Sequence, residues 1–211
     1  AIIYCSGRDE IIGGNAHSNF KITQTKGNEV LMLTDATNIF QDSIRVFPNQ
    51  NSHTRGRETD GSASWSVFTV GTPNSTNVSA MQEYATTPVF SLFSGYYPTT
   101  INLSLSSPDP QTTIYYTTNG DDPNSTSTVY TNPINISVTT VIKAVAYSSV
   151  NNIPSSFIDY HTFFVNDTHS IPIVSVSGSG LDDLLVSIAG WGNSTAAPYS
   201  NPAGTIEYFD K

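Results

Sequence analysis

The sequence offers few side chains whose types and spacing could perform chemistry. Its 211 residues include 17 Asp and Glu, eight Lys and Arg, four His and one Cys. Glycoside hydrolysis usually needs two carboxylates facing each other across a sugar, and phosphoryl transfer needs a phosphate-binding Lys, a base and metal-binding carboxylates. Asp182, Asp183, Glu207 and Asp210 do not make such a set. We therefore assign no catalytic, cofactor-binding or metal-binding residue, and we expect no cofactor.

Two histidines could bind a metal ion. His17 and His53, together with Asp9 or Asp60, have the nitrogen and oxygen donors found in zinc sites. No pair of them stands at ligand spacing, so we favour ordinary surface or turn histidines.

Three aspartates in turns could bind calcium. Asp109, Asp121 and Asp122 lack the alternating ligand spacing and the terminal Glu of an EF-hand loop. We favour solvated turn carboxylates over a calcium site.

Arg55 and Arg57 could bind an anion. In the interpretation that we favour, Arg57 instead pairs with Asp60 or with a backbone carbonyl and holds a long loop. The Trp65 ring then fills the core beneath that loop.

Phe93, Tyr96 and Tyr97 could form an aromatic platform for stacking against a sugar. The alternative is that these rings pack in a core or at a sheet edge, because residues 95–98 stand where the first strand of the central module should begin. We favour the packing role.

The composition predicts a β-protein that lacks a basic surface for binding nucleic acid. Apolar residues make up 37% of the chain and charged residues only 12%, and Ser, Thr, Asn, Gly and Pro fill much of the remainder. Such a chain is poor in helix formers and rich in strand and turn formers. The net charge of −9 comes without any basic run, which argues against binding nucleic acid. We also expect no membrane span, because no apolar run has the required length.

The stretch 97–147 has the two-residue period of β-strands. Apolar residues alternate with polar ones over 101–105, which predicts a strand with one face in a core. Pro and Asp at 107–110 predict a turn, and Asn-Gly-Asp-Asp-Pro at 119–123 predicts another.

The segment 141–147 is apolar in both alternating positions except at Lys143, which indicates a central strand. Alternation of Lys143 with Ala144 and Ala146 predicts that Lys143 faces solvent.

Three blocks of this stretch, 114–123, 129–134 and 140–147, resemble the chitobiase/β-hexosaminidase C-terminal-type Ig-like module in order and spacing. The turn Tyr-Tyr-Thr-Thr-Asn-Gly-Asp-Asp-Pro at 115–123 is the most recognisable part. The resemblance implies an accessory β-sandwich that lies beside another domain and is not itself a catalyst.

The first part of the chain resembles the C-terminal half or two-thirds of a lamin-tail domain, which is also an Ig-like β-sandwich. The matching positions, in the family's order, are Arg57, Asp60, Gly61, Trp65, Thr72, Pro73 and Asn77. The family's opening strands have no counterpart before Ala1, so we expect an open sheet edge and an incomplete core.

The last part of the chain resembles the opening of a CotH-type protein-kinase-like domain. It has predicted strands at 171–177 and 204–211, and between them a short amphipathic helix is predicted from the helical spacing of Leu181, Leu184, Leu185 and Ile188. The resemblance implies that the catalytic and metal-binding residues of that family would lie beyond Lys211.

We therefore predict an all-β fold of tandem Ig-like β-sandwiches, the first incomplete, followed by a short α/β tail. The expected division is a lamin-tail-like part at 1–77, a connector at 78–87, the chitobiase-type module at 88–165 and the start of a CotH kinase-like domain at 166–211.

Three functions compete at this point. The first is a non-catalytic region that spaces or docks a neighbouring domain in a bacterial secreted or cell-surface protein. The second is a carbohydrate-binding accessory module, and the third is the N-terminal piece of a CotH-family protein kinase. The expected partners are neighbouring domains of the same longer chain, or a glycan or protein at the cell surface.

Overall fold

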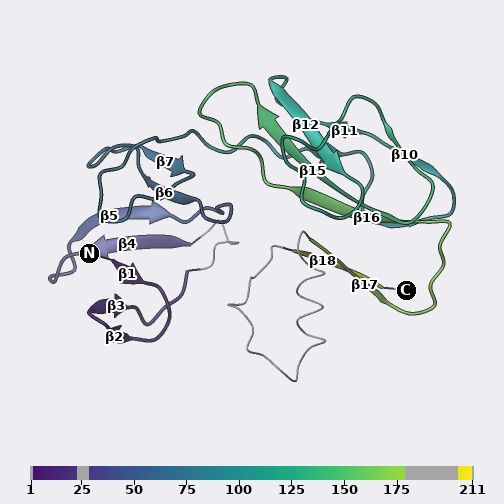
Figure 1. Cartoon of the computed structure of the whole chain (residues 1–211). Coiled ribbons are helices and arrows are strands. Elements are labelled where there is room, and N and C mark those ends of the chain that lie inside the picture. The colour runs from purple at the N-terminus through teal and green to yellow at the C-terminus, as the bar shows by residue number, and fades with distance from the viewer. Residues whose placement is uncertain (1, 23–28, 179–203, 211) are drawn as a thin grey trace, which may run out of the picture. The chain divides into compact units, whose positions relative to one another are not determined.

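The computed structural model describes residues 2–22, 29–178 and 204–210, and every regular element in these ranges is a β-strand. The chain divides into two compact units, 1–83 and 84–211 (Figure 1). The helix expected at 181–188 lies outside the described residues. Within the described ranges, no helix has the length and apolar character needed to cross a membrane.

The first unit is built from one small sheet and two hairpins. β1, β3 and β2 form a three-stranded sheet, and β4 pairs with β5 and β6 with β7, both antiparallel. The strands are β1 (Ile3–Tyr4), β2 (Glu10–Ile12), β3 (Asn15–His17), β4 (Val30–Thr34), β5 (Phe40–Arg45), β6 (Thr54–Arg57) and β7 (Trp65–Phe68).

The turn between β4 and β5 is closed by one carboxylate. Oδ1 of Asp35 accepts hydrogen bonds from the backbone N–H groups of Thr37 and Ile39, at 2.8 and 3.0 Å. Asn38 takes a φ of 63°, which Asn tolerates better than most residues. These bonds close the turn at 35–38. Next to Phe20, Lys21 forms an isolated bridge with Ser6.

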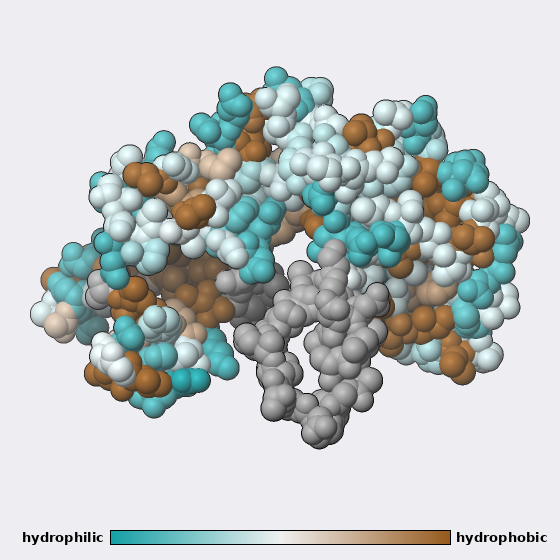
Figure 2. Space-filling model, viewed as in Figure 1, coloured by the Kyte–Doolittle hydropathy of each residue, from teal (hydrophilic) through white to brown (hydrophobic). Residues whose placement is uncertain are grey.

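The first unit buries little apolar surface among its described residues. Val67 and Phe68, at 0% and 2% exposure, are its most deeply buried large hydrophobic side chains. Many others stay in contact with water, including Ile3, Ile11, Met32, Leu33, Ile39 and Val70. In the space-filling view, hydrophobic residues reach the surface as separate brown patches among hydrophilic ones (Figure 2).

The second unit contains a β-sandwich and a β-ribbon. One layer of the sandwich is a five-stranded sheet in the order β13-β12-β15-β16-β9, and the other consists of the pairs β10-β14 and β11-β8. The strands are β8 (Val89–Phe90), β9 (Gly95–Tyr97), β10 (Ile101–Leu103), β11 (Leu105–Ser106), β12 (Thr112–Thr117), β13 (Thr128–Val129), β14 (Ile134–Ile136), β15 (Thr140–Ser148), β16 (Asp159–Val165), β17 (Ile173–Ser177) and β18 (Thr205–Phe209).

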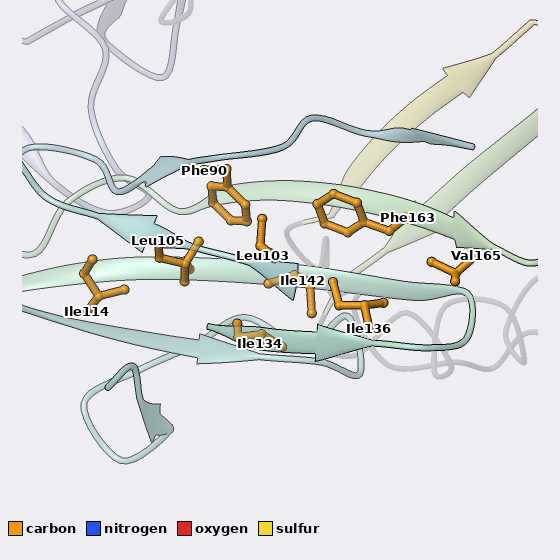
Figure 3. Close-up of a cluster of buried hydrophobic side chains, with 10 residues drawn as sticks. Phe90, Leu103, Leu105, Ile114, Ile134, Ile136, Ile142, Phe163 and Val165 are labelled. Atoms are coloured by element: carbon orange, nitrogen blue, oxygen red, sulfur yellow. The ribbon is translucent and has the colours of Figure 1, made fainter. Parts of the chain in front are cut away.

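The sandwich core lies between these two layers, as Figure 3 shows. The five-stranded sheet contributes side chains such as Ile142 and Phe163, and the opposite layer contributes Leu103 and Ile136, all at 2% exposure or less. Alternation explains the selection, because every second residue of a strand points to the same face. The predicted all-β fold with an Ig-like sandwich is confirmed for the described residues.

Both predicted turns of the sandwich are confirmed. Oδ1 of Asp109 accepts the backbone N–H of Gln111 at 2.9 Å, as in an Asx turn. Gly120 has a φ of 81°, where a side chain would be strained.

The β17–β18 ribbon lies on the face of the five-stranded sheet that points away from the sandwich core. Phe209 of the ribbon meets Phe164 of β16 with ring centroids 4.9 Å apart. Thr162 of β16 hydrogen-bonds to Ser175 of the ribbon at 2.8 Å. The centre of the sheet is therefore covered on both faces, which is why β15 is apolar in both alternating positions.

Candidate functional site

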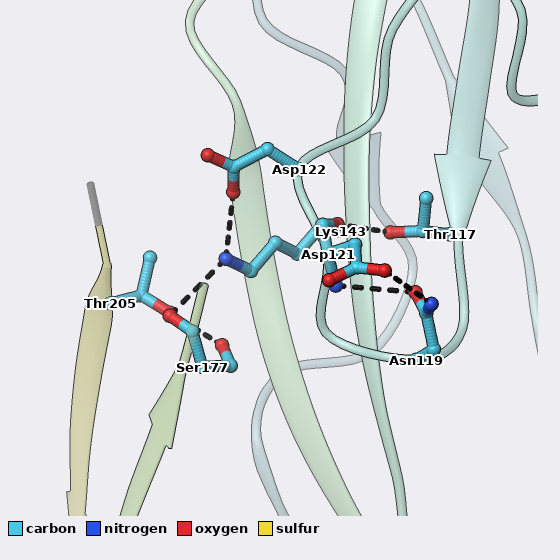
Figure 4. A network of polar contacts seen from close by, with 7 residues as sticks. All are labelled: Thr117, Asn119, Asp121, Asp122, Lys143, Ser177 and Thr205. Atoms are coloured by element: carbon cyan, nitrogen blue, oxygen red, sulfur yellow. Dashed lines mark hydrogen bonds and ion pairs between the residues drawn. The ribbon is translucent and has the colours of Figure 1, made fainter. Parts of the chain in front are cut away.

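Lys143 is the most unusual residue of the second unit, because its side chain is completely buried. Its Nζ donates to Oδ1 of Asp122 at 2.8 Å and to the backbone carbonyl of Ser177 at 3.4 Å (Figure 4). The prediction that Lys143 faces solvent was wrong. Lys143 does point away from the sandwich core, as alternation requires, but Ser177 of the β17–β18 ribbon covers that face.

A rigid turn presents Asp122 to this lysine. Oγ1 of Thr117 donates to the carbonyl of Asp121 at 2.6 Å, and Nδ2 of Asn119 donates to the Asp121 carboxylate at the same distance. The turn directs Asp121 toward the loop and Asp122 toward Lys143.

The candidate calcium ligands do not come together. Asp121 bonds within its own turn, Asp122 pairs with Lys143, and Asp109 closes a different turn. In the part of the chain that the structure describes, no group of three or more His, Cys, Asp and Glu side chains could hold a metal ion.

A second polar group, which is partly buried, lies between the sheet and the ribbon. The Glu207 carboxylate of β18 accepts hydrogen bonds from the hydroxyls of Ser94 and of Thr162, the latter at 2.5 Å. The sequence analysis did not identify Glu207 as a contact residue. Alternation along β18 could have identified it, because Thr205, Glu207 and Phe209 share one face of that strand.

Ser94, His161 and Asp159 include the residue types of a nucleophilic triad, but their geometry is structural. Nδ1 of His161 accepts the backbone N–H of Ser94 at 3.1 Å and also lies 2.8 Å from the Ser94 hydroxyl, which donates to the Glu207 carboxylate. Nε2 of His161 lies 3.9 Å from the Asp159 carboxylate, beyond hydrogen-bonding distance. A base whose acceptor nitrogen is already engaged by the backbone cannot readily activate the hydroxyl.

The three-ring platform considered as an alternative at Phe93, Tyr96 and Tyr97 does not form. Tyr97 turns toward the sandwich core, where its ring lies 5.8 Å from that of Phe163. Tyr96 turns to the opposite face and stacks on Phe164, with centroids 4.9 Å apart and an interplanar angle of 23°. Consecutive residues of a strand point to opposite faces, so the two tyrosines cannot share one platform.

Tyr96 instead belongs to an exposed cluster with His169 and Asp167. The Tyr96 ring is 40% exposed and lies 6.4 Å from the His169 ring. His169 is oriented by the Asp167 carboxylate, 3.1 Å from its Nε2, and Thr139 donates to the same carboxylate at 3.1 Å. The hydrogen bond from Thr139 is the main cause that lowers the pKa of Asp167.

In the first unit, Arg57 holds strands together. Its Nη2 lies 2.6 Å from both carboxylate oxygens of Asp42, and its Nη1 donates to the Ala63 carbonyl at 2.9 Å. The predicted backbone carbonyl partner is thus present, but the acidic partner is Asp42 and not Asp60. Asp42 lies 15 positions earlier, on β5, and the local sequence could not show that β5 and β6 meet.

Trp65 does not fill a core beneath the loop. Its ring is 39% exposed, and the Arg57 guanidinium lies 4.6 Å from the ring centroid, a cation–π arrangement. Arg55 makes a bidentate ion pair with Glu83, with both contacts at 2.7 Å. Ion pairing and packing therefore account for both arginines without an anion.

Other residues named in the lamin-tail resemblance are also in contact. Nδ2 of Asn77 donates to the Arg57 carbonyl at 2.7 Å, and the backbone N–H of Asn77 donates to Asp60 at 3.1 Å. The Thr72 hydroxyl donates to Oδ1 of Asn77 at 3.1 Å. These residues form one network around the β6–β7 hairpin.

The two histidines considered as metal ligands have different surroundings. His17 stacks on Tyr4 with centroids 5.0 Å apart, and its Nδ1 lies 2.9 Å from the Ser6 hydroxyl. Partial burial lowers the pKa of His53.

The first unit also contains an open cavity of about 550 Å³. The cavity is mostly apolar, in keeping with the small core of this unit. Its lining residues are Cys5, Ile22, Leu31, Ile44, Arg45, Val46, Phe47, Asn49, Arg55 and Trp65.

Comparison with known proteins finds a match within the sandwich. Residues 92–157 match the family model of the chitobiase/beta-hexosaminidase C-terminal domain. This range contains β9 to β15, so the resemblance expected for the central module is confirmed there. The comparisons give no support for the lamin-tail and CotH-type resemblances. No curated protein and no solved structure matches the chain significantly.

Proposed function

We propose that this chain is a non-catalytic, extracytoplasmic β-sandwich region whose central module docks the segment that follows it. The observation that carries this function is the covered outer face of the five-stranded sheet. Lys143, Thr162 and the sheet edge at Ser94 bind the β17–β18 ribbon through polar contacts that are buried or partly buried. An accessory Ig-like module that uses its second face in this way fixes the polypeptide leaving it.

The wider organisation is part of the same proposal. Residues 1–77 would be a lamin-tail-like region, 78–87 a connector, 88–165 the chitobiase-type module and 166–211 a CotH kinase-like region. The contacts among Arg57, Asp60 and Asn77 support the first assignment. The parent protein would be secreted or held at a bacterial cell surface, and its partners would be neighbouring domains of the same chain.

Amide hydrogen exchange in the full chain tests the docking role. The variant Glu207→Ala leaves the hydroxyls of Ser94 and Thr162 without their shared acceptor, so we expect faster exchange in 173–177 and 205–209. Exchange within β12 and β15 should stay unchanged, which separates loss of docking from loss of folding. Ile206→Ala, on the outward face of the same strand, is the control. Unchanged protection of the ribbon amides against exchange in Glu207→Ala would contradict the proposal.

Carbohydrate binding is a second candidate, and the exposed cluster of Tyr96, His169 and Asp167 favours it. An exposed ring supported from behind by Phe164 offers a face for a sugar, and the oriented His–Asp pair offers polar groups for hydroxyls.

A glycan array that includes chitin-type oligosaccharides tests this candidate with two variants. We expect Tyr96→Ala to abolish any signal and Phe93→Ala to keep it, because Phe93 is exposed but lies outside the cluster. Tyr97→Ala is unsuitable, since Tyr97 packs toward the core. The absence of a binding signal with the wild-type chain, or equal signals in both variants, would contradict carbohydrate binding at this site.

A further inference from the structure

Ser94 is reached from both faces of the five-stranded sheet. His161 and Thr162 are consecutive residues of β16, so their side chains point to opposite faces. On the core side, Nδ1 of His161 lies 2.8 Å from the Ser94 hydroxyl. On the ribbon side, the Glu207 carboxylate accepts a hydrogen bond from the same hydroxyl. One hydroxyl at the sheet edge therefore joins His161 to β18.

With a neutral His161 ring, this junction lacks one hydrogen. A serine hydroxyl has a single hydrogen, and the Ser94 hydroxyl gives it to Glu207. Nδ1 of the neutral ring accepts the Ser94 backbone N–H at 3.1 Å, so it carries no hydrogen of its own. Lone pairs of Nδ1 and of the Ser94 oxygen then face each other at 2.8 Å. A proton on Nδ1 turns this contact into a hydrogen bond.

Two carboxylates favour that proton. Asp159 stands two residues earlier on the same face of β16, and its carboxylate lies 3.9 Å from Nε2 of His161. Glu207 of β18 is the second, and it is reached through the Ser94 hydroxyl. Negative charges near an imidazole stabilise its protonated form. Burial alone would oppose a charge on this ring, but a protonated ring has a carboxylate or hydroxyl oxygen near each nitrogen.

The other elements packed against the His161 ring present apolar side chains. Phe90 and Phe93 meet it with centroids 4.7 and 5.7 Å apart, and Ile142 is its register partner on β15. Within the ranges that the structure describes, no hydrogen bond or ion pair joins a basic side chain to His161. Among these contacts, Asp159 and Glu207 are therefore the charged groups that act on its protonation.

We propose that His161 is a pH sensor that tightens the docking of the β17–β18 ribbon as the pH falls. This inference rests on the docking proposed above and adds its regulation. In the protonated state Nδ1 donates to the Ser94 hydroxyl and that hydroxyl donates to Glu207, which gives one directed chain from β16 to β18. The Ser94 backbone N–H loses Nδ1 as its acceptor, but hydrogen bonds that involve charged groups are about twice as strong as neutral ones.

The sign of the effect follows from linkage. The docked ribbon places Glu207 beside Ser94, so the docked state binds the proton more tightly than the undocked state. Docking is therefore stronger below the pH range in which His161 titrates, and this gain is lost as the pH rises through that range.

Amide hydrogen exchange in the full chain at about pH 5.5 and about pH 8, on either side of the usual titration range of histidine, tests the sensor. Each rate is divided by the intrinsic rate at the same pH, because exchange itself depends on pH. We expect the ribbon amides in 173–177 and 205–209 to be about fivefold better protected at the lower pH. Amides of β12 and β15 are the internal reference.

Three variants assign the effect. His161→Gln keeps a polar side chain that cannot become charged, so the ratio of protection at the two pH values should fall to about one. His169→Gln is the matched control, because His169 contacts Phe164 on the ribbon side of the same sheet and should leave the ratio unchanged. Glu207→Gln keeps an acceptor oxygen but removes the charge, so it should also lower the ratio, and it serves if His161→Gln folds poorly.

The outcomes separate the sensor from the docking itself. Equal ribbon protection at both pH values, or better protection at the higher one, would overturn the sensor and leave the docking in place. Ribbon amides without protection at either pH would contradict both. A pH dependence that survives in His161→Gln, or that disappears in His169→Gln, would assign the effect to another group.

Discussion

A lysine without exposed side-chain surface needs a partner for its charge, because transfer of an unpaired ammonium from water is very costly. Lys143 has that partner in Asp122, whose side chain remains 32% exposed. The two members of the pair therefore differ in their access to solvent. Loss of the carboxylate leaves a buried charge, whereas loss of the ammonium leaves a carboxylate that water can reach.

This asymmetry predicts the order of two substitutions. We expect Asp122→Asn to lower the free energy of unfolding by about 2 kcal/mol, which is less than for a fully buried pair because Asp122 is partly solvated. Lys143→Met keeps most of the apolar stem and should cost under about 1 kcal/mol. Urea denaturation measures both, with Asp121→Asn as the control for the turn. A larger loss in Lys143→Met than in Asp122→Asn would contradict this account of the pair.

The ion pair of Asp42 should make the stability of the first unit sensitive to acid. Its hydrogen bond from Arg57 is the main cause that lowers its pKa below the ordinary value of 3.8. A carboxyl group with a lowered pKa in the folded state stabilises the fold above the unfolded pKa, and this contribution is lost as the pH falls through the folded pKa. We expect Asp42→Asn to destabilise the first unit at pH 6 and to have a much smaller effect near pH 2. Denaturation midpoints at the two values measure this difference, and an equal effect at both would show that the Asp42 charge does not stabilise the unit.

At the scale of elements, the alternation of apolar and polar residues carries more information about the structure than our sequence-based predictions used. It correctly gave β10, β12 and β15 and the central place of β15, because a two-residue period directly reports which residues share a face. The same rule already separates Tyr96 from Tyr97. What alternation cannot report is what covers a face, so the burial of Lys143 depends on a ribbon that is distant in sequence. The Arg57–Asp42 pair was missed for the same reason.

Gly120 connects the turn beside β12 to the ribbon. Its φ of 81° disfavours any side chain, and an added Cβ would lie 3.1 Å from the Cβ of Ser177. We expect Gly120→Ala to destabilise the second unit by about 1–2 kcal/mol through strain and to loosen the ribbon as well. Hydrogen exchange in 173–177 measures the second effect.

Gly61→Ala separates strain from crowding. Gly61 has a similar φ of 79°, but an added Cβ would meet no atom within 4 Å. It should therefore show the stability loss of strain alone. Unchanged ribbon protection in Gly120→Ala would mean that the turn does not support the docking.

At the scale of the whole molecule, the two units differ in how much core they have. The sandwich places side chains from both of its layers in one buried cluster, whereas the first unit leaves most of its large apolar residues exposed among those described. Stability depends on buried apolar area exceeding the conformational entropy of the ordered chain. The two units should therefore differ in their ability to fold alone.

Separate fragments test this difference. We expect residues 84–165 to unfold cooperatively, because this fragment keeps both layers of the sandwich and the bond from the Ala85 N–H to the Pro154 carbonyl at 2.9 Å. Without the ribbon, Lys143 regains water, so its ion pair with Asp122 becomes less important for stability. Residues 1–83 should show a broad transition of low unfolding enthalpy. The open cavity and the exposed strands mean that little buried apolar surface becomes exposed to water on unfolding. Differential scanning calorimetry of both fragments compares them directly. A transition of 1–83 as sharp as that of 84–165 would contradict the expected difference in core size between the two units.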